Sequence, residues 1–207
     1  LKSASEILNE TEDRAQRNKL IDILNHDVQR IERLITDYSQ MLKDEVALSR
    51  EKMKKINLKL ILRSVVDDFN NIYETKRGIK IVLKDSSNQE EYFIHGIENR
   101  IEQIIANLLD NSISFSDDNK KILVEIYKDE NEKIILKVID EGKGFKETNT
   151  KKIFDRFYSN RPDNFGEHSG LGLNIVKNLV DLHGATINAS NNVTKKGANV
   201  EIIFPKL

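Results

Sequence analysis

The chain of 207 residues contains no cysteine and only two prolines. Without cysteine it can form neither disulfides nor thiolate metal sites, which suits a reducing compartment. No apolar run approaches the roughly 18 residues that a transmembrane helix needs. The opening Leu1-Lys2-Ser3-Ala4 lacks the charged-then-apolar pattern of a secretory signal. The net charge is −1, so the overall balance indicates neither nucleic acid nor an anionic membrane as the main partner.

The composition indicates a folded, soluble protein. Hydrophobic residues make up 38% of the chain, enough to build a core, and charged residues make up 32%. The length leaves room for one or two domains of ordinary size. Because the chain does not begin with methionine, we expect it to be a fragment of a longer protein.

Neither glycine nor proline occurs from Arg14 to Ser49, where apolar residues recur with alternating three- and four-residue spacing. This spacing is typical of a helix with a broad apolar stripe, as in a four-helix bundle. The stripe consists of Leu20, Ile21, Leu24, Val28, Ile31, Leu34, Ile35, Tyr38, Met41 and Leu42. Residues 1–8 supply only a short partner, so we expect a hairpin whose first helix is truncated. The alternative is a lone helix that forms a coiled coil with a second copy.

After a charged linker at 50–57 the pattern changes to mixed helices and strands. Antiparallel strand pairs and amphipathic helices in this order predict an α/β sandwich with one mixed sheet and one helical layer. The overall fold class is therefore α+β. The expected helices are 58–74, 97–111 and 171–182, and the expected strands are 79–83, 92–94, 122–127, 133–139, 185–189 and 198–204.

Three clusters in this second region share a ligand chemistry. Asn107 and Asn111 lie one turn apart on an apolar helix, so their amides share a face and can join phosphate oxygens around Mg²⁺. Asp140 follows a strand, where a carboxylate can accept a hydrogen bond from an adenine amino group, while Gly142 and Gly144 let the backbone approach a flat ligand. Taken singly, the asparagines are more typical of exposed or C-capping residues at a helix end, and many hairpin turns share the Asp-x-Gly-x-Gly pattern.

The third cluster, Ser169-Gly170-Leu171-Gly172-Leu173, opens a helix. Free backbone N–H groups at a helix start, unobstructed by side chains, form a cradle for phosphate. It is not a Walker A loop, because no Gly-Lys-Ser/Thr follows it. It is not a Rossmann loop either, because no strand precedes it.

In this order the clusters resemble the N, G1 and G2 boxes of the ATP-binding domain of sensor histidine kinases, within the superfamily that includes gyrase B, Hsp90 and MutL. The resemblance covers about residues 58–207, and residues 153–158 resemble the F box. It implies binding of ATP and Mg²⁺, with Asn111 as metal ligand and Asp140 facing adenine. The implied nucleotide-binding residues are Asn107, Asn111, Asp140, Gly142, Gly144, Phe145, Tyr158, His168, Ser169, Gly170, Leu171, Gly172 and Leu173.

Residues 1–49 resemble the dimerisation and phosphotransfer hairpin of these kinases, and the tracts 26–30 and 161–173 are similar to their ChvG branch. The resemblance implies a homodimer, transfer of the γ-phosphoryl of ATP to a histidine, and a response-regulator receiver domain as partner. It also implies the cytoplasmic portion of an inner-membrane protein, which meets the membrane only through preceding segments. His26 is followed by an acid but lies on the second helix without the expected proline step, so we expect the acceptor histidine upstream of Leu1.

Three positions depart from the family pattern: Ser114, Ser159 and His168. They leave open an alternative, a nucleotide-binding conformational module or pseudokinase that does not transfer phosphate. A protein-serine kinase of the anti-sigma type is a further possibility. It predicts no long dimerisation hairpin, and the heptads after Ile21 argue against it.

Overall fold

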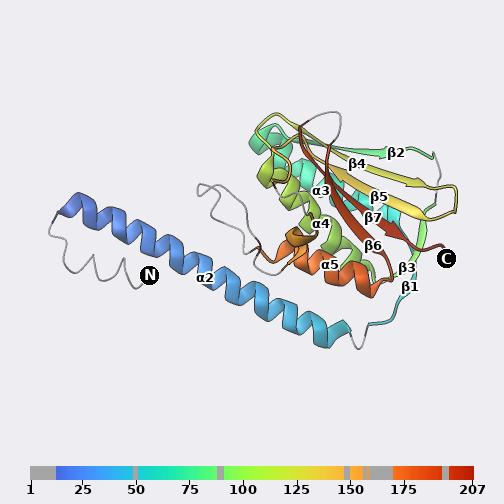
Figure 1. Cartoon of the computed structure of the whole chain (residues 1–207), viewed down its shortest axis with the longest axis horizontal. Helices are drawn as coiled ribbons and strands as arrows, with labels where there is room; N and C mark the ends of the chain where they lie inside the picture. Colours follow the sequence, from blue (N-terminus) through green and yellow to red (C-terminus); the bar gives the residue numbers. More distant parts are fainter. Residues whose placement is uncertain are drawn as a thin grey trace. The chain divides into compact units, whose positions relative to one another are not determined.

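The computed structural model describes residues 13–48, 51–87, 91–146, 150–155, 158, 170–192 and 196–207. Among these residues the chain forms two compact units, helix α2 and the region from residue 51 onward (Figure 1). Within the described ranges, no helix has both the length and the apolar character needed to cross a membrane.

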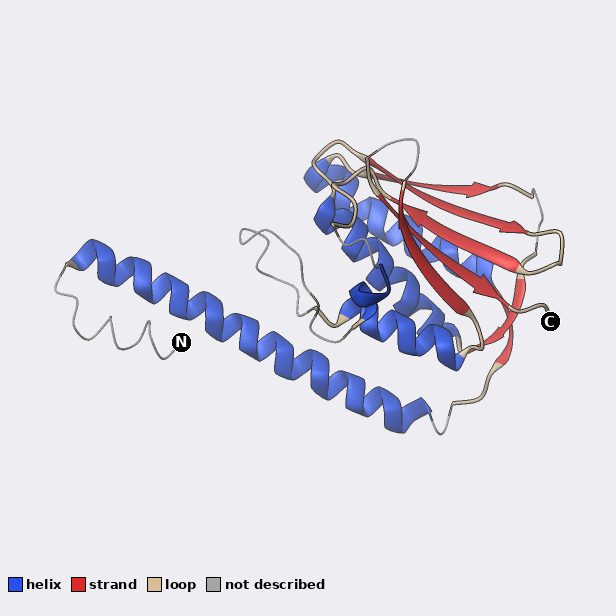
Figure 2. Ribbon diagram, in the orientation of Figure 1, coloured by secondary structure: helices blue, strands red, loops and turns tan. Residues whose placement is uncertain are grey.

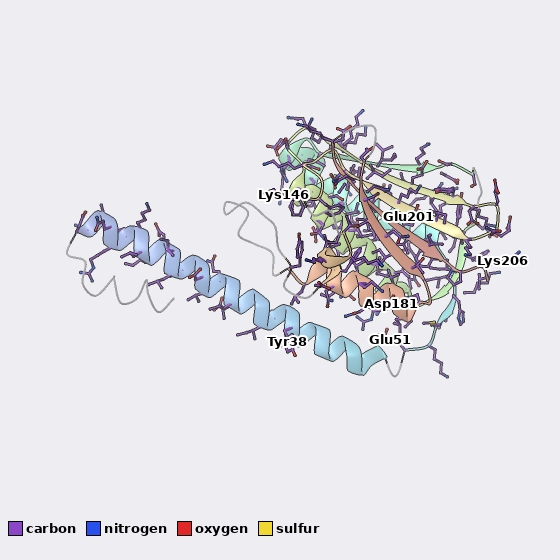
Figure 3. The ribbon with its side chains drawn as sticks, viewed as in Figure 1. Tyr38, Glu51, Lys146, Asp181, Glu201 and Lys206 are labelled. Atoms are coloured by element: carbon purple, nitrogen blue, oxygen red, sulfur yellow. The ribbon has the colours of Figure 1, made fainter. Side chains whose placement is uncertain are left out.

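Helix α2 (Arg14–Leu48) confirms the helix expected from the heptad spacing. It begins where Asp13 accepts a hydrogen bond from the N–H of Ala15 at 2.9 Å, an N-terminal cap. Several side chains of the apolar stripe are exposed, from Ile35 at 61% to Ile31 at 39%, and Tyr38 at 42% is labelled in Figure 3. An exposed apolar stripe of this kind is a surface that a second helix can cover.

The second unit is built on a five-stranded mixed sheet in the order β2-β4-β5-β7-β6. Strand β2 pairs with β4 in parallel, and the other pairs are antiparallel. The hairpins expected at 122–139 and 185–204 are confirmed. The strands are β2 (Lys80–Asp85), β4 (Lys121–Lys128), β5 (Ile134–Ile139), β6 (Thr186–Asn191) and β7 (Ala198–Phe204).

Three helices form a single layer on one face of this sheet (Figure 2). They are α3 (Leu58–Arg77), α4 (Glu98–Phe115) and α5 (Gly172–Leu182). Helix α4 is the middle helix, since it packs against both α3 and α5. It buries the apolar side predicted from its spacing, namely Ile101, Ile104, Ile105, Leu108 and Leu109.

A second sheet corrects the expectation of a single one. Strand β1 (Lys54–Asn57), within the segment expected to be a linker, pairs antiparallel with β3 (Phe93–Gly96). The side-chain oxygen of Asn57 accepts hydrogen bonds from the N–H groups of Lys59 and Tyr92, which ties this strand pair to the start of α3. The strand was missed because Ile56 is its only apolar residue, so no alternating pattern marks it.

Candidate functional site

The two asparagines of α4 lie against the first residue of α5. A Cβ atom added to Gly172 would stand 3.7 Å from Asn107 Oδ1 and 4.0 Å from Asn111 Nδ2. The first and third sequence clusters, far apart in the chain, are therefore brought together. Glycine at position 172 leaves the space between the helix start and the two amides unfilled.

Arg77, at the end of α3, holds the C-terminal end of α4. Its Nη1 donates to the carbonyl of Ile113 and its Nη2 to the carbonyl of Ser116, both at 2.8 Å. Its Nε forms an ion pair with Asp118 at 2.7 Å. These bonds satisfy carbonyls that a helix end leaves without an intrahelical partner. The sequence analysis missed Arg77; its only local signal is a basic residue in the last turn of α3.

Asp140 is a buried carboxylate, 4% exposed, directly after β5. Its Oδ1 accepts hydrogen bonds from the N–H groups of Gly142 and Ala198, both at 2.9 Å. Burial raises the pKa of this carboxyl, while the two hydrogen bonds act in the opposite direction. Within the part of the chain that the structure describes, no group donates to Oδ2. Oδ2 therefore keeps its capacity to accept a hydrogen bond.

Both glycines after Asp140 lie where a side chain would not fit. A Cβ on Gly142 would lie 2.4 Å from the carbonyl oxygen of Phe115, the last residue of α4. Gly144 has φ +72°, a conformation that favours glycine, and a Cβ there would lie 2.6 Å from Asn191 Oδ1. The segment after Asp140 is therefore packed between the end of α4 and the end of β6.

Phe145 is held through its backbone by Asn191, the last residue of β6. The N–H of Phe145 donates to Asn191 Oδ1 at 2.6 Å, and Asn191 Nδ2 donates to the carbonyl of Phe145 at 2.9 Å. The sequence analysis did not single out Asn191, because nothing in its own neighbourhood distinguishes it from other asparagines in a polar turn.

The F-box segment packs on α5 through the short helix η1 (Thr150–Phe154). Asn174 Nδ2 donates to the carbonyl of Phe154 at 2.8 Å, and the side chain of Phe154 is buried. The N–H of Tyr158 donates to the carbonyl of Asp155 at 3.3 Å.

At the start of α5, Leu171 is fully buried, Leu173 is half-buried, and Gly170 has φ +74°. The predicted residues His168 and Ser169 lie outside the described residues, as do Ser159 and the side chain of His26. Of the departures from the family pattern, only Ser114 can be followed. Its hydroxyl donates to the carbonyl of Asp110 at 2.7 Å.

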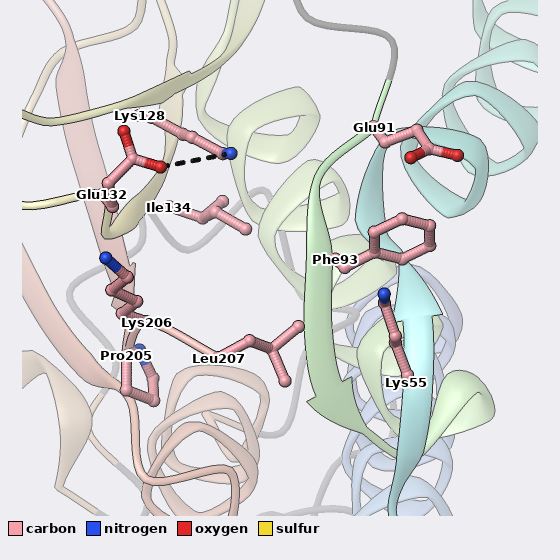
Figure 4. Close-up of a pocket in the computed structure, with 9 residues that line it drawn as sticks. All are labelled: Lys55, Glu91, Phe93, Lys128, Glu132, Ile134, Pro205, Lys206 and Leu207. Atoms are coloured by element: carbon pink, nitrogen blue, oxygen red, sulfur yellow. Dashed lines mark ion pairs between the residues drawn. The ribbon is translucent and has the colours of Figure 1, made fainter.

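Two cavities lie away from these residues. One of about 480 Å³ is lined by residues of both sheets and by the three residues that follow β7, and its lining includes Lys55, Phe93 and Lys206 (Figure 4). Another of about 580 Å³ follows α3 and the edge strand β2. Neither contains a residue predicted for the nucleotide, so the site rests on the geometry of α4, α5 and the segment after β5.

Comparison with known proteins agrees with this geometry. The sequence pattern of the family "Histidine kinase-, DNA gyrase B-, and HSP90-like ATPase" matches residues 96–207. The sensor protein ChvG of Rhizobium meliloti (strain 1021) is 34% identical over an alignment of 203 residues that covers 95% of this chain and 35% of the relative. The chain thus spans about a third of that relative's length.

Solved structures share the fold. The catalytic domain of the histidine kinase ThkA aligns with a TM-score of 0.65 at 25% identity, covering 75% of this chain and 97% of that one. ThkA solved in complex with the response regulator protein TrrA aligns with a TM-score of 0.66 at 22% identity, covering 100% of this chain and 58% of that one. This chain therefore belongs to the histidine kinase-, DNA gyrase B- and HSP90-like ATPase family, and its relatives there include sensor histidine kinases of the ChvG type.

Proposed function

We propose that this chain is the ATP-using kinase portion of a two-component sensor histidine kinase. The observation that carries the proposal is the approach of Asn107 and Asn111 on α4 to Gly172 at the start of α5. It brings two amides, which can bind a metal–phosphate complex, beside a helix start, which can bind phosphate. The buried carboxylate of Asp140 supplies the complementary acceptor for an adenine amino group.

The roles proposed for individual residues follow from their chemistry. Asp140 Oδ2 accepts from adenine, while Gly142, Gly144 and Phe145 shape the surface beside the base. The segment of Gly170, Leu171, Gly172 and Leu173 presents backbone N–H groups to the phosphates. Asn111, with Asn107 beside it, is the proposed ligand of Mg²⁺, which when bound neutralises phosphate charge. Tyr158, His168 and Ser169 are proposed to line the same site from the segment before α5.

The phosphoryl group is proposed to pass from ATP to a histidine of the dimerisation hairpin, upstream of Leu1, and then to an aspartate of a response regulator. The exposed stripe of α2 supports a homodimer, because two hairpins would bury it in a four-helix bundle. The complex of ThkA with TrrA supports a response regulator as partner. The proposed organisation is a hairpin at 1–49, a connection at 50–57 that ends in strand β1, and an ATP-binding domain at 58–207, in the cytoplasmic part of a membrane protein.

Calorimetric titration of ATP into the chain, with Mg²⁺ and with EDTA, tests the nucleotide site. Asn111→Ala should weaken binding in Mg²⁺ by about tenfold or more. The same change should have little effect in EDTA, where the metal makes no contribution. Asn178→Ala is the matched control, since it removes an exposed asparagine from α5. Equal ATP affinity of the wild type and Asn111→Ala in Mg²⁺ would contradict the assignment.

Incubation with γ-labelled ATP tests transfer. The chain alone should take up no acid-labile, base-stable label, whereas a version extended upstream to include the first helix should become labelled. Binding without labelling of the extended version would instead favour the nucleotide-binding module that transfers no phosphate. Label on the chain that disappears in His26→Ala would make His26 the acceptor.

A further inference from the structure

The side chain of Asn191 makes a paired contact with the backbone of Phe145. Its Oδ1 accepts from the N–H of Phe145 at 2.6 Å, and its Nδ2 donates to the carbonyl of the same residue at 2.9 Å. The side-chain amide thus satisfies the backbone N–H and carbonyl of Phe145, as a neighbouring strand would. Two bonds to one residue restrict both the position and the orientation of its peptide groups.

The same hairpin also holds the other end of the segment. Asn191 is paired with Ala198 in the register of β6 and β7. Ala198 in turn donates its N–H to Asp140 Oδ1 at 2.9 Å and accepts from the N–H of Asp140 at 3.0 Å. Residues 140–145 are therefore tied at both ends to one pair of facing residues, Asp140 to Ala198 and Phe145 to Asn191.

The glycine at position 144 is matched to this amide. Its φ of +72° turns the chain toward β6, and an added Cβ would come within 2.6 Å of Asn191 Oδ1. Asn191 itself is exposed. Because exposed hydrogen bonds contribute little to folding, these bonds act mainly on the shape of the segment.

We propose that Asn191 is a positioning residue that makes the site prefer adenine over guanine nucleotides, by holding residues 142–145 in one conformation beside Asp140. The inference rests on the proposed function, in which Asp140 accepts a hydrogen bond from the base. Adenine carries an amino donor where guanine carries a carbonyl acceptor, so Asp140 favours adenine only when the base is held in one place. If residues 142–145 become mobile, the base is no longer held in one place and the preference for adenine is lost.

The test is a pair of titrations, ATP and GTP, into the whole chain with Mg²⁺. Asn191→Ala should weaken ATP binding by about tenfold, the worth of one well-placed hydrogen bond. GTP binding, which does not use the Asp140 bond, should change less, so the ratio of the two affinities should fall. Asn191→Asp keeps the acceptor for the Phe145 N–H but cannot donate when ionised. Its ATP affinity and its ratio of ATP to GTP affinity should therefore lie between those of the alanine variant and the wild type.

Asn188→Ala is the matched control. Asn188 lies on the same strand, is exposed, and makes no side-chain hydrogen bond to the described part of the chain. Its variant should bind both nucleotides as the wild type does. The thermal midpoint of each variant is measured alongside, to separate a change of site shape from a change of stability.

The outcomes distinguish this inference from the proposed function. A wild-type chain that binds no ATP would overturn the proposed function. A wild type that binds ATP, with an unchanged ATP-to-GTP ratio in Asn191→Ala, would overturn the positioning role alone. Equal weakening of both nucleotides together with a lower thermal midpoint would show a purely structural role and also overturn it.

Discussion

Asp140 and Ala198 exchange two hydrogen bonds. The N–H of Asp140 donates to the carbonyl of Ala198 at 3.0 Å, and the N–H of Ala198 donates to Asp140 Oδ1 at 2.9 Å. One residue of β7 therefore holds both the main chain and the side chain of the carboxylate. With Gly142 also donating to Oδ1, the two carboxylate oxygens are no longer equivalent. Oδ1 is used by contacts within the fold, and Oδ2 is the oxygen that we propose for the ligand.

Asp140→Asn should separate binding from stability. Two N–H donors face Oδ1, so the amide oxygen takes that place and the amide NH₂ takes the place of Oδ2. A donor there opposes an adenine amino group, so ATP affinity should fall by about tenfold or more in a calorimetric titration.

Asp140→Asn should not lower the stability of the fold. Burial raises the Asp140 pKa above its unfolded value, so the ionised form disfavours folding, and wild-type stability is gained as pH falls through the folded pKa. The asparagine variant should therefore melt at the wild-type temperature or higher at neutral pH. Unchanged ATP affinity would contradict the role given to Oδ2, and a large loss of stability would contradict the orientation.

Substitutions at two glycines should have opposite effects. An alanine Cβ at Gly142 would meet the Phe115 carbonyl at 2.4 Å, so Gly142→Ala should lower the free energy of unfolding by about 1–3 kcal/mol, the cost of overpacking. At Gly172 the nearest atoms are 3.7 Å and 4.0 Å away, which is ordinary contact, and alanine favours a helix over glycine by about 1 kcal/mol.

Gly172→Ala should therefore fold as well as the wild type or better, yet bind ATP less tightly, because its methyl group enters the space beside Asn107 and Asn111. Urea unfolding and ATP titration of both variants check this pair. The prediction fails if Gly142→Ala is as stable as the wild type, or if Gly172→Ala binds ATP unchanged.

His183 should make stability depend on pH. Its side chain is buried, Nε2 accepts from the N–H of Ile97 at 3.1 Å, and Nδ1 lies 2.7 Å from the carbonyl of Leu179. This arrangement requires the neutral ring, with its proton on Nδ1. Burial lowers the pKa of His183 below the ordinary value of 6.5.

The unfolded chain therefore binds the proton more readily, and the stability that His183 contributes is lost as pH falls below about 6.5. Urea unfolding at pH 7.5 and 5.5 should show a smaller loss for His183→Gln, which does not titrate, than for the wild type. Equal losses in the two proteins would show that other groups account for the pH dependence.

Arg77 should stabilise the end of α4 through its forked geometry. Arg77→Met removes donors from the carbonyls of Ile113 and Ser116 and should lower the free energy of unfolding by about 1–3 kcal/mol. Arg77→Lys should not restore it, because one amine cannot reproduce the two-pronged contact. Arg63→Met, a change at an exposed residue of α3, serves as control in the same urea unfolding series. If Arg77→Lys had the same free energy of unfolding as the wild type, the charge of Arg77 and not its forked geometry would be what stabilises the end of α4.

Local periodicity predicted most elements of the second unit, because α3, α4 and α5 each bury one continuous apolar side and the hairpins alternate. The end of α4 was placed too early, at Asn111 instead of Phe115, since residues 112–115 alternate polar and apolar side chains and so lack the three- and four-residue spacing of a helix. That last turn is held by the side chain of Arg77, which comes from another helix. Strand β1 was missed for a similar reason, since its pairing with β3 is not encoded in its own residues.

The sequence by itself determined the chemical groups of the candidate site: two amides one turn apart, a carboxylate after a strand, and glycines before a helix. It also determined the apolar stripe of α2, because residues spaced alternately three and four apart lie on one face of an α-helix. Only the tertiary structure decided that Gly172 meets Asn107 and Asn111, that Ala198 distinguishes the two oxygens of Asp140, and that Asn191 holds Phe145. These contacts join residues distant in the chain, and their geometry depends on how the strands and helices pack.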